Sequence, residues 1–319
     1  MRFALANKDS YLKIPLTFVS FVLVFALSAG KVFAIQFSPL PVGAGVYAFI
    51  GDTGVRTYEN QGMNANAGFI VTKAGVVVVD SGSSYLVAKA MHAAIRQVTQ
   101  LPVKYVINTG GQDHRWLGNG YFKEIGAQII ASSQALADMQ ERGASELEAL
   151  KPELREKIAG TKAVYPDRLV GKADTLTMSG TEIRILYFRG GHTPGDAVVW
   201  LPKSRILFSG DLIFVDRLLG VLPFSNTQNW LASFAEIEAL KPKAIIPGHG
   251  KVCNLAKARR ETKDYLFLLR AHMKKALDQG QELQSAIETL DQRAYGYLEN
   301  YDLLKGGNAS RVYLEMETE

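Results

Sequence analysis

The sequence predicts an α/β protein in which two β-rich halves and their helices stack as a four-layer αββα sandwich. Short runs of β-branched residues, separated by glycines, are typical of buried strands joined by tight turns. Longer amphipathic segments lie between these runs, and the two halves have similar composition. The 319 residues are 47% apolar, which is enough to build one large domain or two small ones.

The first half begins with three strand-like runs, followed by a helix and a strand. This strand-helix-strand order is typical of a βαβ unit, where functional groups gather beyond the carboxyl ends of the strands. A further strand then precedes a helical insert, for which Ser132 or Ser133 is the expected N-cap. The expected strands are 45–50, 67–72, 75–80, 103–107 and 126–131; the expected helices are 84–98 and an insert at about 133–166, helical to about 158.

The second half repeats this arrangement and ends in helices with basic, solvated faces. We expect residues 35–255 to form the main domain and residues 256–319 to pack on it as a helical extension. The expected strands are 175–178, 182–188, 197–201, 205–209 and 244–246; the expected helices are 230–240, 256–278 and 283–291.

Residues 1–34 resemble a secretory signal peptide. Basic residues precede an apolar run that ends at Val32-Phe33-Ala34, which predicts cleavage after Ala34 and a periplasmic or secreted protein. The alternative is an uncleaved anchor, because the run is near the short limit for a membrane span. With cleavage, no stable membrane insertion is expected.

The charge balance argues against a nucleic-acid-binding protein, and the single cysteine excludes a disulfide-stabilised one. The leader holds four of the 36 basic residues and one of the 31 acidic residues, so the mature chain keeps 32 and 30, a net charge of +2. This balance gives no electrostatic footprint for nucleic acid. Cys253 is the only cysteine, so an internal disulfide is impossible, and we interpret it as a small buried residue.

Three of the five histidines follow predicted strands in glycine-rich loops: His114, His192 and His249. His92 and His272 lie within helical patterns and are interpreted as structural. Imidazole nitrogens and carboxylate oxygens suit Zn²⁺ and similar divalent ions, and short loops at the ends of a sheet hold such ligands in place.

Four loop motifs occur in order along the chain, each after a predicted strand. They are residues 108–114 (Asn-Thr-Gly-Gly-Gln-Asp-His), 190–196 (Gly-Gly-His-Thr-Pro-Gly-Asp), Gly210-Asp211, and 247–250 (Pro-Gly-His-Gly). Together they resemble the motifs of the metallo-β-lactamase superfamily over about residues 40–255. The leader, the insert and the terminal helices are similar to an exported branch associated with quinoprotein relays or sulfur oxidation.

The resemblance implies two metal sites, of which this chain keeps one. The second site maps onto Asp113, His114 and His249, with Asp211 as the bridging ligand, while the first site keeps only His192. Aligned on the Asp-His pair, the two histidines of the family's NTHxHxDH motif fall on residues 109 and 111, and the segment is one residue short.

The resemblance therefore implies an exported hydrolase with one ion, zinc first and iron or manganese as alternatives. It would act on a small ester, thioester, lactone or lactam, with Asp113 or Asp211 orienting a water and His192 donating a proton or binding the oxyanion. The alternatives are an Fe(II)-type oxidoreductase similar to persulfide dioxygenases, with an unidentified periplasmic redox partner, and a non-catalytic binding or assembly protein.

Overall fold

The computed structural model describes Met1 and residues 35–319. The expected signal peptide and its cleavage site after Ala34 lie outside the part described in detail, and their interpretation stays a prediction. Residues 35–319 belong to one compact unit. Among the described residues, no helix has the length and apolarity that crossing a membrane would require.

Within residues 35–319, the first sheet has seven strands, which follow each other in chain order. The first four pair antiparallel and the last four pair parallel. The central strand β4 is buried on both faces, which explains its unbroken run of valines. The strands are β1 (Leu40–Gly43), β2 (Val46–Phe49), β3 (Ala67–Thr72), β4 (Gly75–Val79), β5 (Val103–Ile107), β6 (Gln128–Ser132) and β7 (Arg168–Val170).

The second sheet has five strands within the same described residues, in the order β12-β11-β10-β9-β8. Only β11 and β12 pair parallel. The strands are β8 (Ala173–Met178), β9 (Thr181–Tyr187), β10 (Ala197–Leu201), β11 (Ile206–Phe208) and β12 (Ala244–Ile246).

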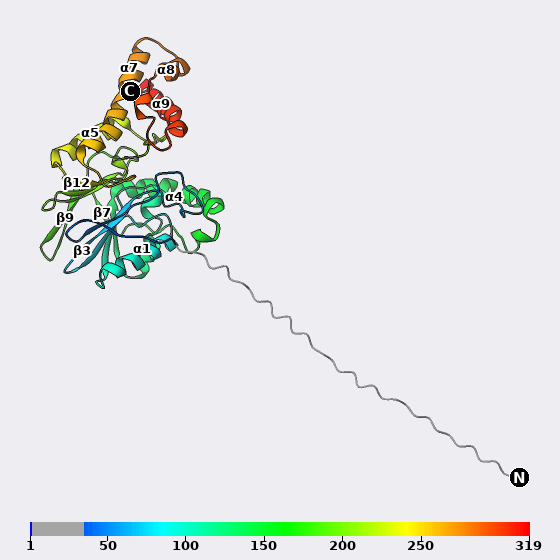
Figure 1. Ribbon diagram of the computed structural model, residues 1–319, viewed down its shortest axis with the longest axis vertical. Coiled ribbons are helices and arrows are strands. Elements are labelled where there is room, and N and C mark those ends of the chain that lie inside the picture. The colour runs from blue at the N-terminus through cyan, green and yellow to red at the C-terminus, as the bar shows by residue number, and fades with distance from the viewer. Residues whose placement is uncertain (2–34) are drawn as a thin grey trace. The chain divides into compact units, whose positions relative to one another are not determined.

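Apolar side chains from both sheets meet in one core, and each sheet buries its other face under helices. Ile70 and Val77 of the first sheet share a cluster with Ile185 and Val199 of the second. Figure 1 shows α1 and α4 beside the first sheet, with α5 and α7 on the far side of the second. This arrangement confirms the predicted αββα sandwich.

Serine side chains cap the N-termini of two helices, and the cap of the helical insert was predicted from the sequence. Ser84 caps α1 and Ser132 caps α4, each accepting a hydrogen bond from a backbone N–H three residues later. The terminal helices share an apolar cluster with the second sheet. The remaining elements are α1 (Tyr85–Val98), α2 (Asp113–Trp116), α3 (Asn119–Glu124), α4 (Ser133–Leu154), η1 (Arg155–Ile158), η2 (Gly210–Leu212), α5 (Thr227–Leu240), α6 (Leu255–Ala258), η3 (Arg259–Lys263), α7 (Asp264–Asp278), α8 (Leu283–Thr289), η4 (Arg293–Tyr295) and α9 (Tyr301–Glu317).

The predicted strands and the helical insert are confirmed, whereas the elements that were not predicted include the edge strands β1 and β7 and helix α9. The edge strands β1 and β7 have four and three residues and are partly exposed, so they carry little apolar periodicity. Helix α9 contains two adjacent glycines, Gly306 and Gly307, which weaken a helical pattern. Tertiary packing against α7 and α8 compensates for that weakness.

Candidate metal centre

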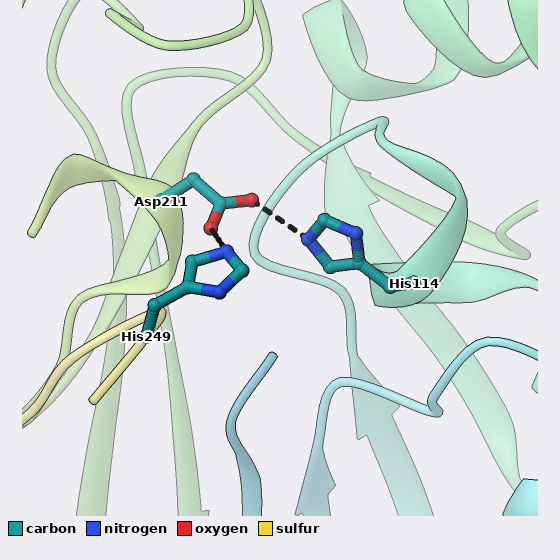
Figure 2. Close-up of side chains that lie close together, drawn as sticks. All are labelled: His114, Asp211 and His249. Carbon is teal, nitrogen blue, oxygen red and sulfur yellow. Dashed lines mark hydrogen bonds and ion pairs between the residues drawn. The ribbon is translucent and has the colours of Figure 1, made fainter. Parts of the chain in front are cut away.

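Three buried side chains converge where loops leave the two sheets: His114, Asp211 and His249. Figure 2 shows both imidazoles pointing at the carboxylate. Nε2 of His114 lies 3.2 Å from Oδ2 of Asp211, and Nε2 of His249 lies 3.1 Å from Oδ1. The three ligand atoms lie within 4.8 Å of one another, which is close enough to hold one ion.

Each residue reaches this point because a strand ends beside it. His114 belongs to α2, which follows β5; Asp211 belongs to η2, which follows β11; and His249 follows β12. Gly248 is needed for this approach, since a Cβ there would lie 2.5 Å from the carbonyl oxygen of Gly210 and 2.6 Å from Oδ1 of Asp211. The glycine therefore lets the His249 loop lie directly against η2.

Arg115 is buried below the cluster and holds Asp211 in place. Its Nε and Nη2 donate to the two oxygens of Asp211, and Nη1 donates to Oδ2 of Asp80 at 3.0 Å. It also donates to the carbonyl oxygens of Asn66 and Gly248. Burial lowers the pKa of Arg115, but the two carboxylates raise it above its ordinary value overall. Arg115 is thus a fixed cation.

Asp80 and Asp211 differ in their electrostatic surroundings. Burial raises the pKa of Asp80, which also accepts hydrogen bonds from the backbone N–H and the hydroxyl of Thr109. Burial also opposes ionisation of Asp211, yet Arg115 and His114 hold its pKa well below the ordinary value. Asp211 is therefore the ionised carboxylate of the centre.

His249 presents a lone pair to Asp211. Its Nδ1 lies 2.6 Å from the carbonyl oxygen of Asn64, and a carbonyl only accepts, so Nδ1 carries the proton. The Arg217 guanidinium is 3.5 Å from Nδ1, at the outer limit for a hydrogen bond. Burial lowers the pKa of His249 well below its ordinary value, which leaves Nε2 unprotonated against a carboxylate oxygen. A cation bound between Nε2 of His249 and the carboxylate oxygen 3.1 Å away would satisfy both atoms.

His192 lies outside this group of three and pairs with Gln112. Its Nδ1 donates to the carbonyl oxygen of Gly220 at 2.9 Å, and its Nε2 lies 2.8 Å from the side-chain amide of Gln112. Burial lowers the pKa of His192 to about 4, so the ring is neutral and Nε2 is an acceptor. The Gln112 atom at this distance is Oε1, so the amide must turn its NH₂ group towards the ring to satisfy an unprotonated Nε2.

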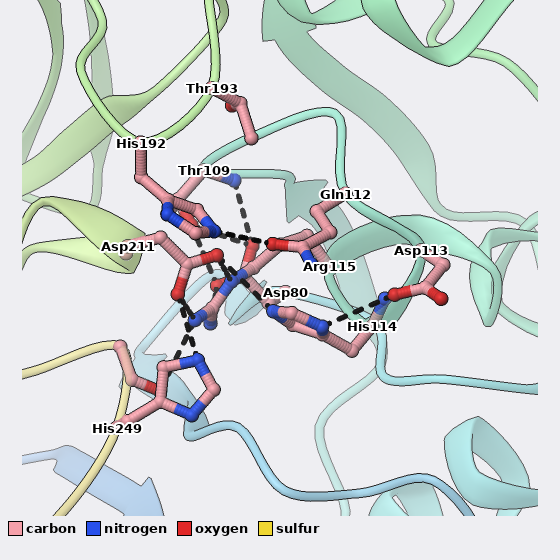
Figure 3. Close-up of polar contacts among 12 residues, drawn as sticks. Asp80, Thr109, Gln112, Asp113, His114, Arg115, His192, Thr193, Asp211 and His249 are labelled. Carbon is pink, nitrogen blue, oxygen red and sulfur yellow. Dashed lines mark hydrogen bonds and ion pairs between the residues drawn. The ribbon is translucent and has the colours of Figure 1, made fainter. Parts of the chain in front are cut away.

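The predicted ligand Asp113 points away from the cluster (Figure 3). Its carboxylate is bound by both terminal nitrogens of Arg56, which comes from the segment between β2 and β3. Burial would raise the pKa of Asp113, but Arg56 and His114 lower it overall. Its nearest approach to the centre is Oδ1, 3.2 Å from Nδ1 of His114. Asp113 therefore supports His114 from behind.

The predicted register of the damaged motif is also wrong by one residue. Thr109 points to Asp80, and Gly111 packs against Asp138, so neither faces the centre. Gln112 does face it, through His192. When residues 108–115 are aligned with the NTHxHxDH motif without a gap, Gly110 and Gln112 occupy the positions of the two histidines of the HxH pair.

In this ungapped register, His114 and Arg115 stand where the motif has its Asp-His pair. Both side chains reach Asp211, as the contacts above show. The dipeptide Asp113-His114 has the same residue types as the Asp-His pair of the motif but lies one position earlier in the chain. This coincidence explains why the predicted register was wrong. Asp196 fixes its own loop, because it accepts a hydrogen bond from the backbone N–H of Thr193 at 2.7 Å.

A pocket of about 300 Å³ opens beside the centre. Arg56, Gln112 and Asp113 form one wall, and α4 contributes Glu146, Leu150 and further residues to the other. Burial and the nearby Asp113 raise the pKa of Glu146 to about 7. The helical insert therefore lines the approach to the centre.

The family model described as "Metallo-beta-lactamase superfamily" matches residues 61–249, more than half of the chain. The chain belongs to the metallo-beta-lactamase superfamily. It is 26% identical to metallo-beta-lactamase IND-1 of Chryseobacterium indologenes over 229 residues, 70% of this chain and 85% of that protein. Similarity to the acyl-coenzyme A thioesterase MBLAC2 of Gallus gallus is 23% over 107 residues, 32% of this chain and 38% of that protein.

Solved structures agree on the fold. The metallo-beta-lactamase from Pontibacter korlensis superposes with a TM-score of 0.59 at 21% identity, and the match covers 72% of this chain and 99% of that chain. In the ungapped register, Gly110, Gln112, His114 and Arg115 stand at the four ligand positions of the HxHxDH motif. This chain therefore differs from the motif at each of these positions.

Sequence reasoning missed Arg56, Gln112 and the structural role of Arg115. Arg56 lies far from the motif in sequence, in a segment without secondary structure, and no pattern marks it. The polar side chain of Gln112, between a glycine pair and Asp113, was the available signal for a residue that faces the centre.

Proposed function

We propose that the protein is a hydrolase that works with one divalent metal ion, zinc in the first place, held by His114, Asp211 and His249. The observation that carries this proposal is the convergence of three buried groups, in which one ring nitrogen of His114, one of His249 and a carboxylate oxygen of Asp211 lie within 4.8 Å of one another. The donor set of two imidazoles and one carboxylate is ordinary for catalytic zinc.

The residues favour one ion rather than two. Arg115 stands at the motif position that would give the second site another imidazole, and a guanidinium cannot coordinate a cation. At the first site, His192 remains with Gly110 and Gln112, and an amide is a poor ligand for zinc. A bound ion would supply Lewis acidity and bring the pKa of a water towards neutrality, to about 7.

The neighbouring residues have separate roles. Asp211 is held by Arg115 and serves as a ligand rather than as a proton acceptor. His192 is neutral with its proton on Nδ1, so its Nε2 accepts a hydrogen bond and does not supply a proton. Gln112 lines the pocket and offers its amide to a polar group of the substrate.

We propose a small ester, thioester, lactone or lactam as the substrate. The relatives include a lactamase and a thioesterase by name, and both reactions open a bond at a carbonyl carbon. The pocket of about 300 Å³ suits a small acyl group rather than a polymer.

Metal content and turnover of matched variants test this function. Purified protein should contain about one equivalent of zinc and hydrolyse at least one of p-nitrophenyl acetate, a small thioester, a lactone and a chromogenic cephalosporin. His249→Ala should lose the metal and turnover, whereas His192→Ala should keep the metal and lower turnover, because Gln112 loses the partner that positions its amide. His272→Ala, which removes a helical histidine bonded to the carbonyl of Ala286, is the control and should change neither. Less than a tenth of an equivalent in the wild type would contradict the proposal and favour a non-catalytic binding protein.

A second function is favoured by the same donor set, because two histidines and one carboxylate also bind Fe(II) in oxygenases. This candidate is an oxidoreductase similar to persulfide dioxygenases. Iron in place of zinc, together with oxygen consumption in the presence of a persulfide, would select it over the hydrolase.

We also infer export of the mature chain, from the leader pattern of residues 1–34. N-terminal sequencing of protein recovered from the periplasm should begin at Ile35. A mature chain that still starts at Met1 and sediments with membranes would support the anchor instead.

A further inference from the structure

We propose that Arg56 holds His114 in the tautomer that closes the metal centre, so that an ion binds only when Arg56 gives up its contact with the imidazole and Asp113 takes its place. The metal part of this inference rests on the proposed function, and the tautomer part does not.

The contacts of Arg56 fix the proton on His114. Nη2 of Arg56 lies 2.8 Å from Nδ1 of His114. A guanidinium only donates, so Nδ1 is the acceptor and the proton of the neutral ring is on Nε2. That N–H points at Oδ2 of Asp211, 3.2 Å away. In this arrangement every polar atom of His114 is satisfied and no nitrogen is free for a metal.

Coordination requires the opposite tautomer, because a metal binds the lone pair of Nε2. The proton must then be on Nδ1, and its acceptor is Oδ1 of Asp113 at 3.2 Å. A carboxylate behind a ligating histidine orients the ring and raises its basicity. Asp113 therefore favours the ion, whereas Arg56 opposes it through both its hydrogen bond and its charge.

The surroundings allow the side chain of Arg56 to move while its segment stays fixed. The Arg56 side chain is 26% exposed and lines the pocket, whereas that of Asp113 is 3% exposed. The same segment is anchored by Asn66, whose side chain donates to the carbonyl oxygens of Pro247 and Gly250. Only the guanidinium has to leave Nδ1 and turn into the pocket.

Opposite effects of two substitutions test the metal part. The dissociation constant for Zn²⁺ is measured by competition with a chromogenic chelator. Arg56→Met should tighten binding, on the order of tenfold, and Asp113→Asn should weaken it by about 10- to 100-fold. If Arg56 merely anchored Asp113, both substitutions would weaken binding, and that result would overturn the proposal.

Two controls match these substitutions in chemistry. Asp138→Asn removes a buried carboxylate that pairs with Arg142 on α4, and Arg270→Met removes a partly buried guanidinium that pairs with Glu315. Neither residue touches the three ligands, so the zinc affinity should stay within a factor of two of the wild type.

Nitrogen-15 NMR of the metal-free wild-type protein tests the tautomer directly. With ¹⁵N-labelled histidine, and with His114→Gln to assign the signals, Nδ1 of His114 should be unprotonated in the wild type and protonated in Arg56→Met. A protonated Nδ1 in the wild type would refute the proposal. This result is independent of zinc, so a wild type that binds no metal would remove the proposed function while the tautomer remains tested.

Discussion

Replacing Arg115 by methionine should be the most destabilising single change near the centre. The substitution keeps an unbranched apolar stem and removes a guanidinium that is 1% exposed and bound to Asp80 and Asp211. Both carboxylates are themselves almost fully buried, at 3% and 1%. Breaking a buried ion pair by removing one partner costs about 3–5 kcal/mol, because the remaining charge stays without compensation.

A loss of this size is a large fraction of the total stability, which is about 5–15 kcal/mol for a folded protein. At about 2–4 °C per kcal/mol for a chain of this size class, the melting temperature should fall by roughly 6–20 °C. The assay is urea and thermal unfolding with a chelator present, so that metal binding does not contribute. The matched control is Arg293→Met, whose side chain is 88% exposed and pairs with Asp291. It should leave the melting temperature unchanged within error.

An Arg115→Met protein that unfolds within 1 kcal/mol of the wild type would refute the reasoning. It would mean that Asp80 and Asp211 are not both charged around this guanidinium. The apolar methionine side chain would then suit the surroundings of the two carboxyl groups as well as the arginine guanidinium does.

Two further predictions concern packing and reactivity. Gly111→Ala should destabilise the fold by about 1–3 kcal/mol, because the new Cβ would lie 2.3 Å from Oδ2 of Asp138; Gly307→Ala, in open space on α9, should instead stabilise it by about 0.5–1 kcal/mol. Urea unfolding of both variants measures this contrast, and equal effects would contradict it. Cys253 is partly rather than fully buried, yet it should resist iodoacetamide at pH 8 in the folded protein, because burial raises the pKa of its thiol to about 12. Mass spectrometry should find it alkylated only after unfolding, and rapid labelling of the native chain would disprove this.

Much of the fold was predictable because its central elements carry strong local signals. The valine run of β4 is buried on both faces, and α4 begins at one of the two serines predicted to cap it. The edge strands β1 and β7 are short, partly exposed and paired on one side only, so their few residues gave no signal of their own.

The centre was predictable in its parts but not in its geometry. His249 and Asp211 lie together as the loop motifs suggested, since each follows the end of a strand. The role of Asp113 was not predictable, because its partner Arg56 is 57 residues away along the chain. A hydrogen bond between residues so far apart in the sequence depends on the tertiary structure. Because Arg56 binds its carboxylate, Asp113 supports His114 and does not serve as the predicted metal ligand.

The one-ion centre is tested most directly by anomalous X-ray scattering from crystals grown with zinc. The account predicts a single anomalous peak within coordination distance, about 2.0–2.2 Å, of Nε2 of His114, Nε2 of His249 and an oxygen of Asp211. A peak between His192 and Gln112, or the absence of any peak at full zinc saturation, would contradict it.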